Sequence, residues 1–448
     1  MRWTDRDALA QLSAMRGGRL RAPDLMADTL DRIAASDLRA IVSLRPRDDL
    51  LAEAADPRPG PLSGLPMAIK DLADTAGLRT TYGHPAFADH VPEVDAPMVA
   101  RLKAAGAIVI GKTNTPEFGL GSHSYNPVHG TTVNPWNPSR SAGGSSGGAG
   151  AALAARLVAL ADGSDMMGSL RNPAAWNNVF GLRPSFGLVP AAPQGDPALH
   201  QLATDGPMAR TPDDLELLLS VMAAPDARVP GSSGPYRATP AKSLRIGWAG
   251  DWGGAYPCEA GILDLCQDAL DGLAEPMAPP FPAEEIWTAW TTLRSFAIAE
   301  KLRPHWSDAF AARSEPKLVW EVERGLALKL EEVTRASGIR AAWFRRMATL
   351  DIDVIALPAA QCFPFDAALD WPQQVAGRSM DTYHRWMEVV VPAALAGLPA
   401  ICVPVGFRDG LPMGVQLIGR RGADGDLIAL ARRMHAAAPW ADRRPDID

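Results

Sequence analysis

The chain contains little lysine and little cysteine, and it has no long apolar run. Only seven of its 44 basic residues are lysines. None of the four cysteines (258, 266, 362 and 402) shows CxxC spacing, so we predict neither a disulfide framework nor a zinc site. No apolar run reaches the roughly 18 residues of a membrane span, and the N-terminus lacks a signal-peptide core. We therefore expect a cytoplasmic protein without membrane contact.

The composition favours a large folded protein that acts on small molecules. Apolar residues make up 47% of the 448 residues and charged residues 21%, which allows an extensive buried core. The net charge is −7, and no basic block or basic-aromatic patch is present, so nucleic-acid binding is not expected. The length fits one large α/β domain or two to three smaller ones.

The hydrophobic pattern alternates between short strands and helices. We predict helices over 23–36, 97–105, 149–160 and 425–437, and buried strands over 65–69, 107–110, 352–357, 401–405 and 415–418. This alternation indicates α/β structure around a mostly buried sheet.

The middle of the chain differs in composition from its two ends. Residues 223–243 are rich in Pro, Gly and Ser and indicate a surface connection. Residues 284–349 are helical in pattern and hold five tryptophans (287, 290, 306, 320 and 343). These tryptophans could cover a pocket, although tryptophan at helical spacing is more often core.

Two serines and one lysine are the candidate chemical groups. Ser145 lies in the Gly/Ser run 143–148, Ser169 follows Met166, Met167 and Gly168, and Lys70 ends the first apolar strand. A serine hydroxyl needs a neighbour that takes its proton before it can attack a carbonyl. Lys70 can take that proton only when neutral, so its pKa must fall by roughly 3 from about 10.4, which is about 4 kcal/mol. Burial shifts an amine in this direction, and Ser145 could relay the proton.

Other interpretations of these residues stay open at this point. Lys70 could simply end a strand and reach water. The Gly/Ser run could be a linker or a phosphate loop, but it lies beside an Ala-rich helix and lacks Gly-Lys-Ser/Thr. Residues 143–147 also fit the G-x-S-x-G elbow of an α/β-hydrolase esterase. That fold needs a later histidine, and the histidines at 200, 305, 384 and 435 are not in distinctive loops.

Seven segments carry a family resemblance. They are 61–71, Gly111–Phe118, Asn134–Gly148, Gly168–Ala175, Gly181–Gly187, Gly206–Thr211 and Ala396–Ala400. In order and spacing the chain resembles the amidase signature family over most of its length. The resemblance implies a single domain with a large mixed twisted sheet between helices and a helical cap. It divides the chain into an N-terminal helical segment (1–60), a signature core (61–222), a variable helical cap (223–350) and C-terminal strands and helix (351–448).

The resemblance also implies a role for each site residue. Ser169 corresponds to the acylated nucleophile, Ser145 to the relay serine after a cis peptide bond, and Lys70 to the general base. The oxyanion hole would be formed by the backbone amides of Met166, Met167, Gly168 and Ser169. Supporting roles would fall to Ser146, Asp165 and Arg171.

The chain departs from the family pattern beside the nucleophile. Family members commonly carry Thr-Gly-Gly-Ser where this chain has Met166-Met167-Gly168-Ser169. Methionine at 167 would be strained if that position needs a positive φ. We interpret Met167 as a change of pocket shape that keeps the oxyanion hole, and residues 176–178 as a changed pocket wall.

The resemblance implies an amidohydrolase that needs no metal or organic cofactor, and no HExxH motif is present. We expect a small, fairly apolar amide, anilide or carbamate as substrate, with urethanase-like cleavage possible, and a monomer or homodimer. The main alternative is the glutamine-hydrolysing component of a tRNA-dependent amidotransferase, which residues 190–196 disfavour because they lack Tyr-Gly-Leu-Val-Ala. A binding protein without turnover would not need to retain Lys70, Ser145 and Ser169 together.

Overall fold

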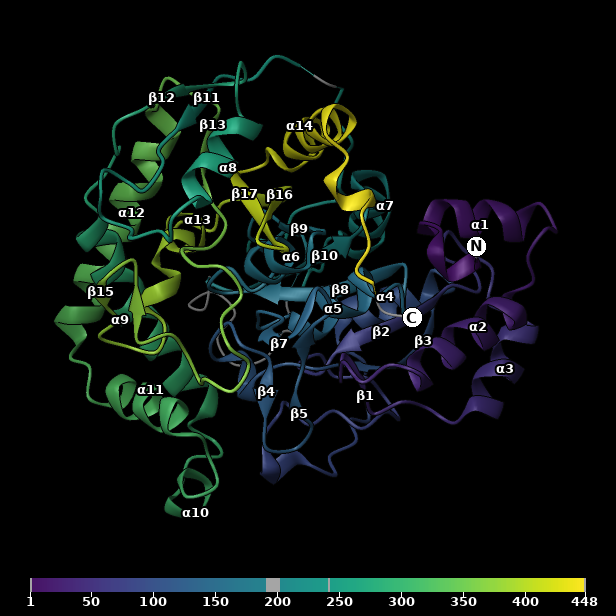
Figure 1. Cartoon of the computed structure of the whole chain (residues 1–448). Helices are drawn as coiled ribbons and strands as arrows, with labels where there is room; N and C mark the ends of the chain where they lie inside the picture. The colour runs from purple at the N-terminus through teal and green to yellow at the C-terminus, as the bar shows by residue number, and fades with distance from the viewer. Residues whose placement is uncertain (1, 191–201, 241, 447–448) are drawn as a thin grey trace.

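A mixed sheet of eleven strands runs through the residues that the computed structural model describes, which are 2–190, 202–240 and 242–446 (Figure 1). The strands follow in the order β1 (Ile41–Val42), β3 (Ile108–Thr113), β2 (Pro66–Lys70), β8 (Leu160–Asp165), β10 (Thr204–Ala209), β9 (Phe180–Arg183), β16 (Ala400–Arg408), β17 (Leu411–Gly419), β13 (Val354–Pro358), β11 (Ile246–Trp248) and β12 (Ala274–Pro276). Strand β2 is parallel to β3 and β8, whereas β10 is antiparallel to β8 and β9. The expected single α/β domain with a mixed sheet is confirmed.

Helices surround this sheet. They are α1 (Ala8–Arg16), α2 (Ala22–Ala34), α3 (Arg47–Ala55), α4 (Pro97–Ala104), α5 (Gly147–Ala154), α6 (Arg171–Asn177), α7 (Pro212–Met222), α8 (Ile262–Ala269), α9 (Ala283–Leu302), α10 (Asp308–Ala311), α11 (Pro316–Leu326), α12 (Leu330–Thr349), α13 (Val391–Leu395) and α14 (Asp424–Ala437). Three two-stranded ribbons complete the structure: β4 (Tyr125–Asn126) with β5 (Gly130–Thr131), β6 (Val133–Asn134) with β7 (Asn137–Ser141), and β14 (Gln374–Val375) with β15 (Arg378–Ser379).

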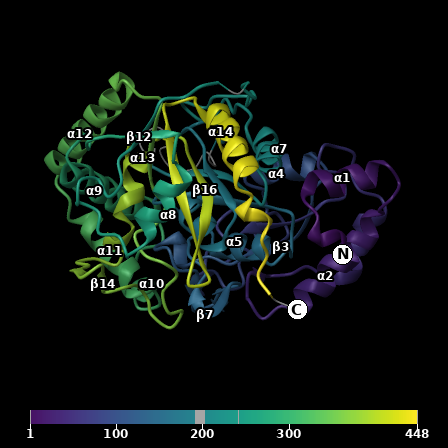
Figure 2. The same cartoon turned by 45° about the horizontal axis from the view of Figure 1, so that its top comes forward.

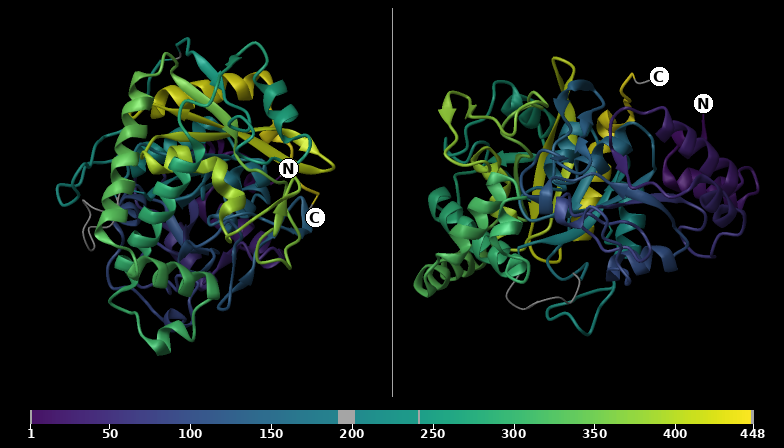
Figure 3. Two further views of the ribbon diagram at one scale, coloured as in Figure 1. Left: turned by 90° about the vertical axis from the view of Figure 1, so that its left-hand side faces the viewer. Right: turned by 90° about the horizontal axis from the view of Figure 1, so that it is seen from below.

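Both faces of the sheet are covered by helices. Gly414 and Gly419 lie five residues apart on β17, so they point to opposite faces. A Cβ on Gly414 would meet Ala175 of α6, and a Cβ on Gly419 would meet Leu427 of α14. Helix α14 crosses the sheet in Figure 2, and the layers are seen from two further sides in Figure 3. Burial on both faces explains why the central strands are continuously apolar.

Helices α9, α11 and α12 pack against one another beside the sheet, within the predicted cap segment. Trp290 and Trp343 are fully buried, and Trp287 is nearly so, which makes most of the tryptophan-rich stretch core. Trp306 is half-buried and Trp320 is exposed. The cap segment also contributes β11 and β12, which the sequence did not predict because each spans only three residues.

The predicted helix over 149–160 is wrong at its C-terminal end. Helix α5 stops at Ala154, and β8 already begins at Leu160. Between them Arg156 has a φ of 59°, a left-handed conformation that ends the helix. The run of Ala and Leu conceals this turn, because both the helix and the strand are buried there.

The two ends of the described chain meet at the N-terminal helices. Arg444 forms an ion pair of 3.6 Å with Asp5, and the termini lie on the same side of the molecule in Figure 1. All four cysteines are free thiols. Among the described residues, no helix combines the length and the apolar character needed to cross a membrane.

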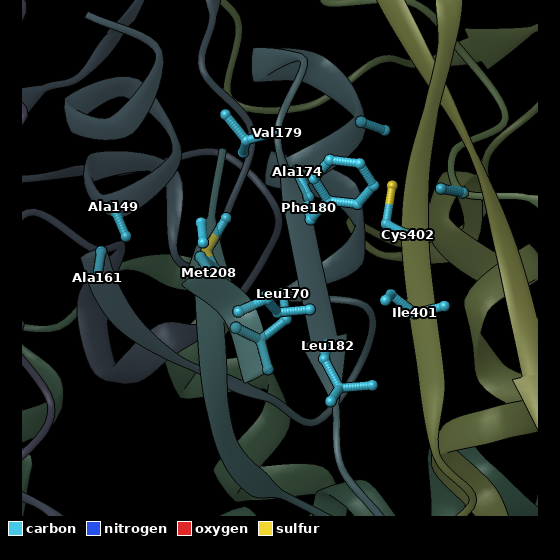
Figure 4. Packing of buried hydrophobic residues seen from close by; sticks show 14 of the residues in the cluster. Ala149, Ala161, Leu170, Ala174, Val179, Phe180, Leu182, Met208, Ile401 and Cys402 are labelled. Atoms are coloured by element: carbon cyan, nitrogen blue, oxygen red, sulfur yellow. The ribbon is translucent and has the colours of Figure 1, made fainter. Parts of the chain in front are cut away.

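The core around α6 fixes the position of the loop that precedes it. Figure 4 shows Leu170 and Ala174 packed against Phe180 and Leu182 of β9 and against Ile401 and Cys402 of β16. Trp176 is also fully buried: it stacks on Trp386 at 5.7 Å, and its Nε1–H donates to the carbonyl of Cys362. Trp176 is therefore a core residue, and it affects the site by holding α6 in place.

Replacement of this indole tests how much the core depends on it. We expect Trp176→Ala to lower the free energy of unfolding by about 3–5 kcal/mol, because a cavity replaces a buried aromatic ring. The matched control is Trp320→Ala on the exposed side of α11, for which a loss of about 1 kcal/mol or less is expected. Urea unfolding measures both, and similar losses for the two variants would contradict this packing.

Candidate active site

Strand β2 places one amine inside the protein. All five residues of β2 are buried, and Lys70, its last residue, is 1% exposed. The Nζ atom of Lys70 lies 2.7 Å from Ser145 Oγ, 2.9 Å from Ser146 Oγ and 3.0 Å from Ser164 Oγ. No carboxylate of the described residues forms an ion pair with it. The amine is thus held by three neutral hydroxyls.

This environment shifts the pKa of Lys70. Burial lowers the pKa of the amine from 10.5 to about 7, while the charges of Asp162, Asp205 and Asp165 partly oppose the shift. The carboxylate of Asp162 accepts the backbone N–H of Lys70 at 3.0 Å and does not pair with the side chain. A substantial fraction of the amine is neutral near pH 7, and only the neutral amine can accept a proton.

Small residues allow the Ser145 loop to approach this amine. The Gly144–Ser145 peptide bond is cis, as the resemblance implied. A Cβ on Gly144 would lie 2.9 Å from the backbone N of His123, and one on Gly148 would lie 2.3 Å from the backbone N of Asn114. The glycine run is therefore a tightly packed loop, and the interpretation as a flexible linker is wrong.

The Ser169 loop connects β8 to α6 and is held by a single carboxylate. Asp165 accepts the backbone N–H groups of Gly168 at 2.9 Å and Leu170 at 3.3 Å. Arg171 and Arg183 donate to the same carboxylate at 3.0 and 3.3 Å. Their positive charges keep the pKa of Asp165 well below its usual range despite burial. Asp165 and Arg171 thus support the loop, and Arg183 joins them.

Ser169 lies at the surface of this loop, next to the Ser145 loop. The residue is 5% exposed, and its carbonyl accepts the backbone N–H of Ser146 at 3.2 Å. Within the described ranges its hydroxyl has no hydrogen-bond partner. Ser169 therefore presents a free hydroxyl beside the loop that contacts Lys70.

The four amides expected in the oxyanion hole divide into two groups. The N–H of Gly168 is already bonded to Asp165. The amides of Met166, Met167 and Ser169 have no acceptor in the part of the chain that the structure describes. Three donors are therefore available to a developing oxyanion.

Met167 occupies its position without a left-handed backbone. The residue with positive φ in this loop is Gly168, at 74°, and Met167 is not among the non-glycine residues of positive φ. A Cβ on Gly168 would come within 2.7 Å of Val390, so glycine is needed there for space as well. The methionine side chain is buried in the main core, and the strain considered for Met167 does not arise.

The elbow interpretation requires a histidine that the site does not supply. His123 bonds Ser141, and His384 bonds Thr382. No histidine of the described residues bonds Ser145, Ser146 or Ser169. His200 and most of the stretch 190–196 lie outside the described residues. Among the described residues, no group of three His, Cys, Asp or Glu side chains is placed to hold a metal ion.

Sequence reasoning missed three residues of this site. Ser164 is the third hydroxyl on Lys70 Nζ, and Arg183 and Gln416 complete the bonds around Asp165 and Arg171. Ser164 has no motif of its own and is found only through the register of β8. Arg183 lies in one of the resemblance segments and could have been selected as a buried charge.

Comparison with known proteins agrees with this geometry. A family model described as Amidase matches residues 24–275 and 298–428. An acylamidase from Rhodococcus erythropolis is 34% identical over 415 residues, covering 86% of this chain and 84% of that protein. The A-type component of the glutamyl-tRNA(Gln) amidotransferase of Saccharolobus solfataricus is 32% identical over 454 residues, covering 93% of this chain and 94% of that protein.

A solved structure extends the similarity to the whole fold. A bacterial aryl acylamidase of the amidase signature family superposes with a TM-score of 0.89 at 27% identity and covers 98% of each chain. On the matched family model, the relatives and the fold, this chain belongs to the amidase signature family and is a hydrolase of amide bonds.

Proposed function

We propose that this amidase cleaves small, fairly apolar amides, anilides or carbamates through an acyl-enzyme on Ser169. The observation that carries the proposal is the neutralised amine of Lys70 in contact with Ser145 and close to the loop of Ser169. Localisation in the cytoplasm and action without a protein partner belong to the same proposal.

Each proton has a place in this mechanism. Neutral Lys70 accepts the proton of Ser145, Ser145 accepts the proton of Ser169, and the Ser169 oxygen attacks the carbonyl carbon. The free amides at 166, 167 and 169 stabilise the negative oxygen that forms. When the tetrahedral species collapses, the proton returns through Ser145 to the leaving nitrogen. Water then attacks the acyl ester by the same relay and regenerates Ser169.

An apolar cluster borders the catalytic loops on two sides. A Cβ on Gly119 would lie 3.3 Å from Ser145 Oγ, so its neighbours Phe118 and Leu120 flank the relay serine. Met166, three residues before Ser169, packs in the same cluster. The cluster continues into the cap through Ile298, Leu302, Trp306, Phe310, Leu318, Val322, Trp371 and Tyr383. This composition favours an apolar group on the substrate.

The names of the relatives agree with this substrate class. They include an acylamidase and an aryl acylamidase. The amidotransferase component, which is also a relative, keeps the alternative of a glutamine amidase open. The apolar cluster favours the main proposal, because a glutamine side chain would leave polar groups unpaired against it.

Active-site labelling tests the nucleophile. We expect a fluorophosphonate to add once per chain, and peptide mapping to place the adduct on Ser169, because its hydroxyl is free and next to the relay. Ser169→Ala should abolish the adduct, and Ser141→Ala, at a buried serine outside the triad, should keep it. An adduct on Ser145 or Ser146 would instead support the elbow-type esterase.

The pH dependence tests the base. Lys70 must be neutral to act, and its pKa is about 7, so kcat/KM should fall as the pH drops through about 7 and level off above it. Below that midpoint the loss should approach about tenfold per pH unit. A profile flat from about pH 5.5 to about pH 8 would contradict the role of Lys70.

A substrate series tests the apolar preference. We expect kcat/KM for acetanilide-type and carbamate substrates to exceed that for short aliphatic amides by about tenfold or more, since burial of one ring is worth about 1.5–3 kcal/mol. The cluster variant Leu120→Ser should reduce this preference. Faster turnover of small polar amides would defeat the proposal.

A further inference from the structure

A carboxylate lies close to the catalytic amine and has no partner among the described residues. Asp205 on β10 is paired in register with Ser164 on β8. Residues directly opposite in an antiparallel pair point to the same face, with Cβ atoms about 5 Å apart. Ser164 Oγ in turn accepts from Lys70 Nζ at 3.0 Å. Lys70, Ser164 and Asp205 therefore follow one another across three neighbouring strands.

Asp205 differs from the other carboxylates near the triad. Asp162 accepts a backbone N–H, and Asp165 accepts two arginines and two amides. Asp205 is half-buried, and its side chain takes part in no hydrogen bond or ion pair within the described residues. A partly desolvated carboxylate without donors costs free energy, so a bound group that supplies donors is favoured there.

The charges around Asp205 also leave room for a cation. Burial raises the pKa of Asp205 to about 6, and the positive charges of Lys70 and Lys301 lower it. Lys301, on the last turn of α9, is exposed and is not within ion-pair distance. At about pH 8 Asp205 is thus ionised, and neither lysine occupies its oxygens.

A bound cation would also assist the base. The charge of Asp205 raises the pKa of Lys70 and so works against the neutral amine. A positive group next to Asp205 offsets that field and favours neutral Lys70. The leaving nitrogen of the substrate must face the Lys70–Ser145 relay to receive its proton, so the substituent on this nitrogen lies nearest to Asp205.

We infer that Asp205 is a specificity-determining residue that binds a positively charged amino group on the amine portion of the substrate. The inference rests on the proposed amide cleavage at Ser169 and refines its substrate class. The preferred substrate joins an apolar acyl group, placed against the cluster around Met166, to an amine that carries an ammonium group.

Two matched amides test this specificity. N-(2-aminoethyl)benzamide and N-propylbenzamide have the same acyl group and differ in an ammonium in place of a methyl group. At about pH 8 we expect the ratio of their kcat/KM values to favour the ammonium compound by about tenfold, the size of one interaction of about 1.4 kcal/mol. Because both rates come from one preparation, incomplete folding cancels in the ratio.

Variants separate a binding role from a structural one. Asp205→Asn should lower the ratio by about tenfold, and Asp205→Glu should retain most of the preference. Lys301→Gln should raise the ratio, because it removes a cation that repels the ammonium group. A ratio unchanged in Asp205→Asn, or a wild-type preference for the neutral amide, overturns the inference. Failure of the wild type to cleave either amide overturns the proposed function itself, and this inference with it.

Discussion

Burial of one amine without a counter-ion is the constraint on which the site depends. Lys70 is at the end of a strand that is buried on every residue, and its nearest polar atoms are the hydroxyls of Ser145, Ser146 and Ser164. Had a carboxylate bonded the amine, the ion pair would have stabilised the protonated form and removed the base. Three hydroxyls satisfy its hydrogen bonds and leave the pKa low.

The neighbouring loop solves the opposite problem. Asp165 is equally buried, yet two arginines and two backbone amides hold it as an anion. A buried charge is stable only when its partners are complete, and here they also fix the course of the loop from Asp165 to Leu170. One carboxylate therefore orders the amides of the oxyanion hole, while the amine on the neighbouring strand is kept neutral.

The sequence predicted the chemistry of this site better than its surroundings. Lys70, Ser145 and Ser169 lie in short motifs whose residue types the reaction demands, and the strands that carry them are apolar enough to predict. Ser164 and Asp205 could not be found in this way, because their importance depends on the pairing of β8 with β10, which are about 40 residues apart in sequence. The end of α5 was missed for a related reason: buried helix, turn and strand share the same small apolar residues.

The state of the Lys70 amine can be measured directly. With seven lysines in the chain, carbon NMR of protein labelled at lysine Cε should resolve each side chain, and Lys70→Met identifies the signal of interest. The account predicts that this signal titrates with a pKa of about 7. Titration of Lys70 near its ordinary pKa of about 10.4 would mean that the amine is protonated at neutral pH, and it would contradict the proposed base.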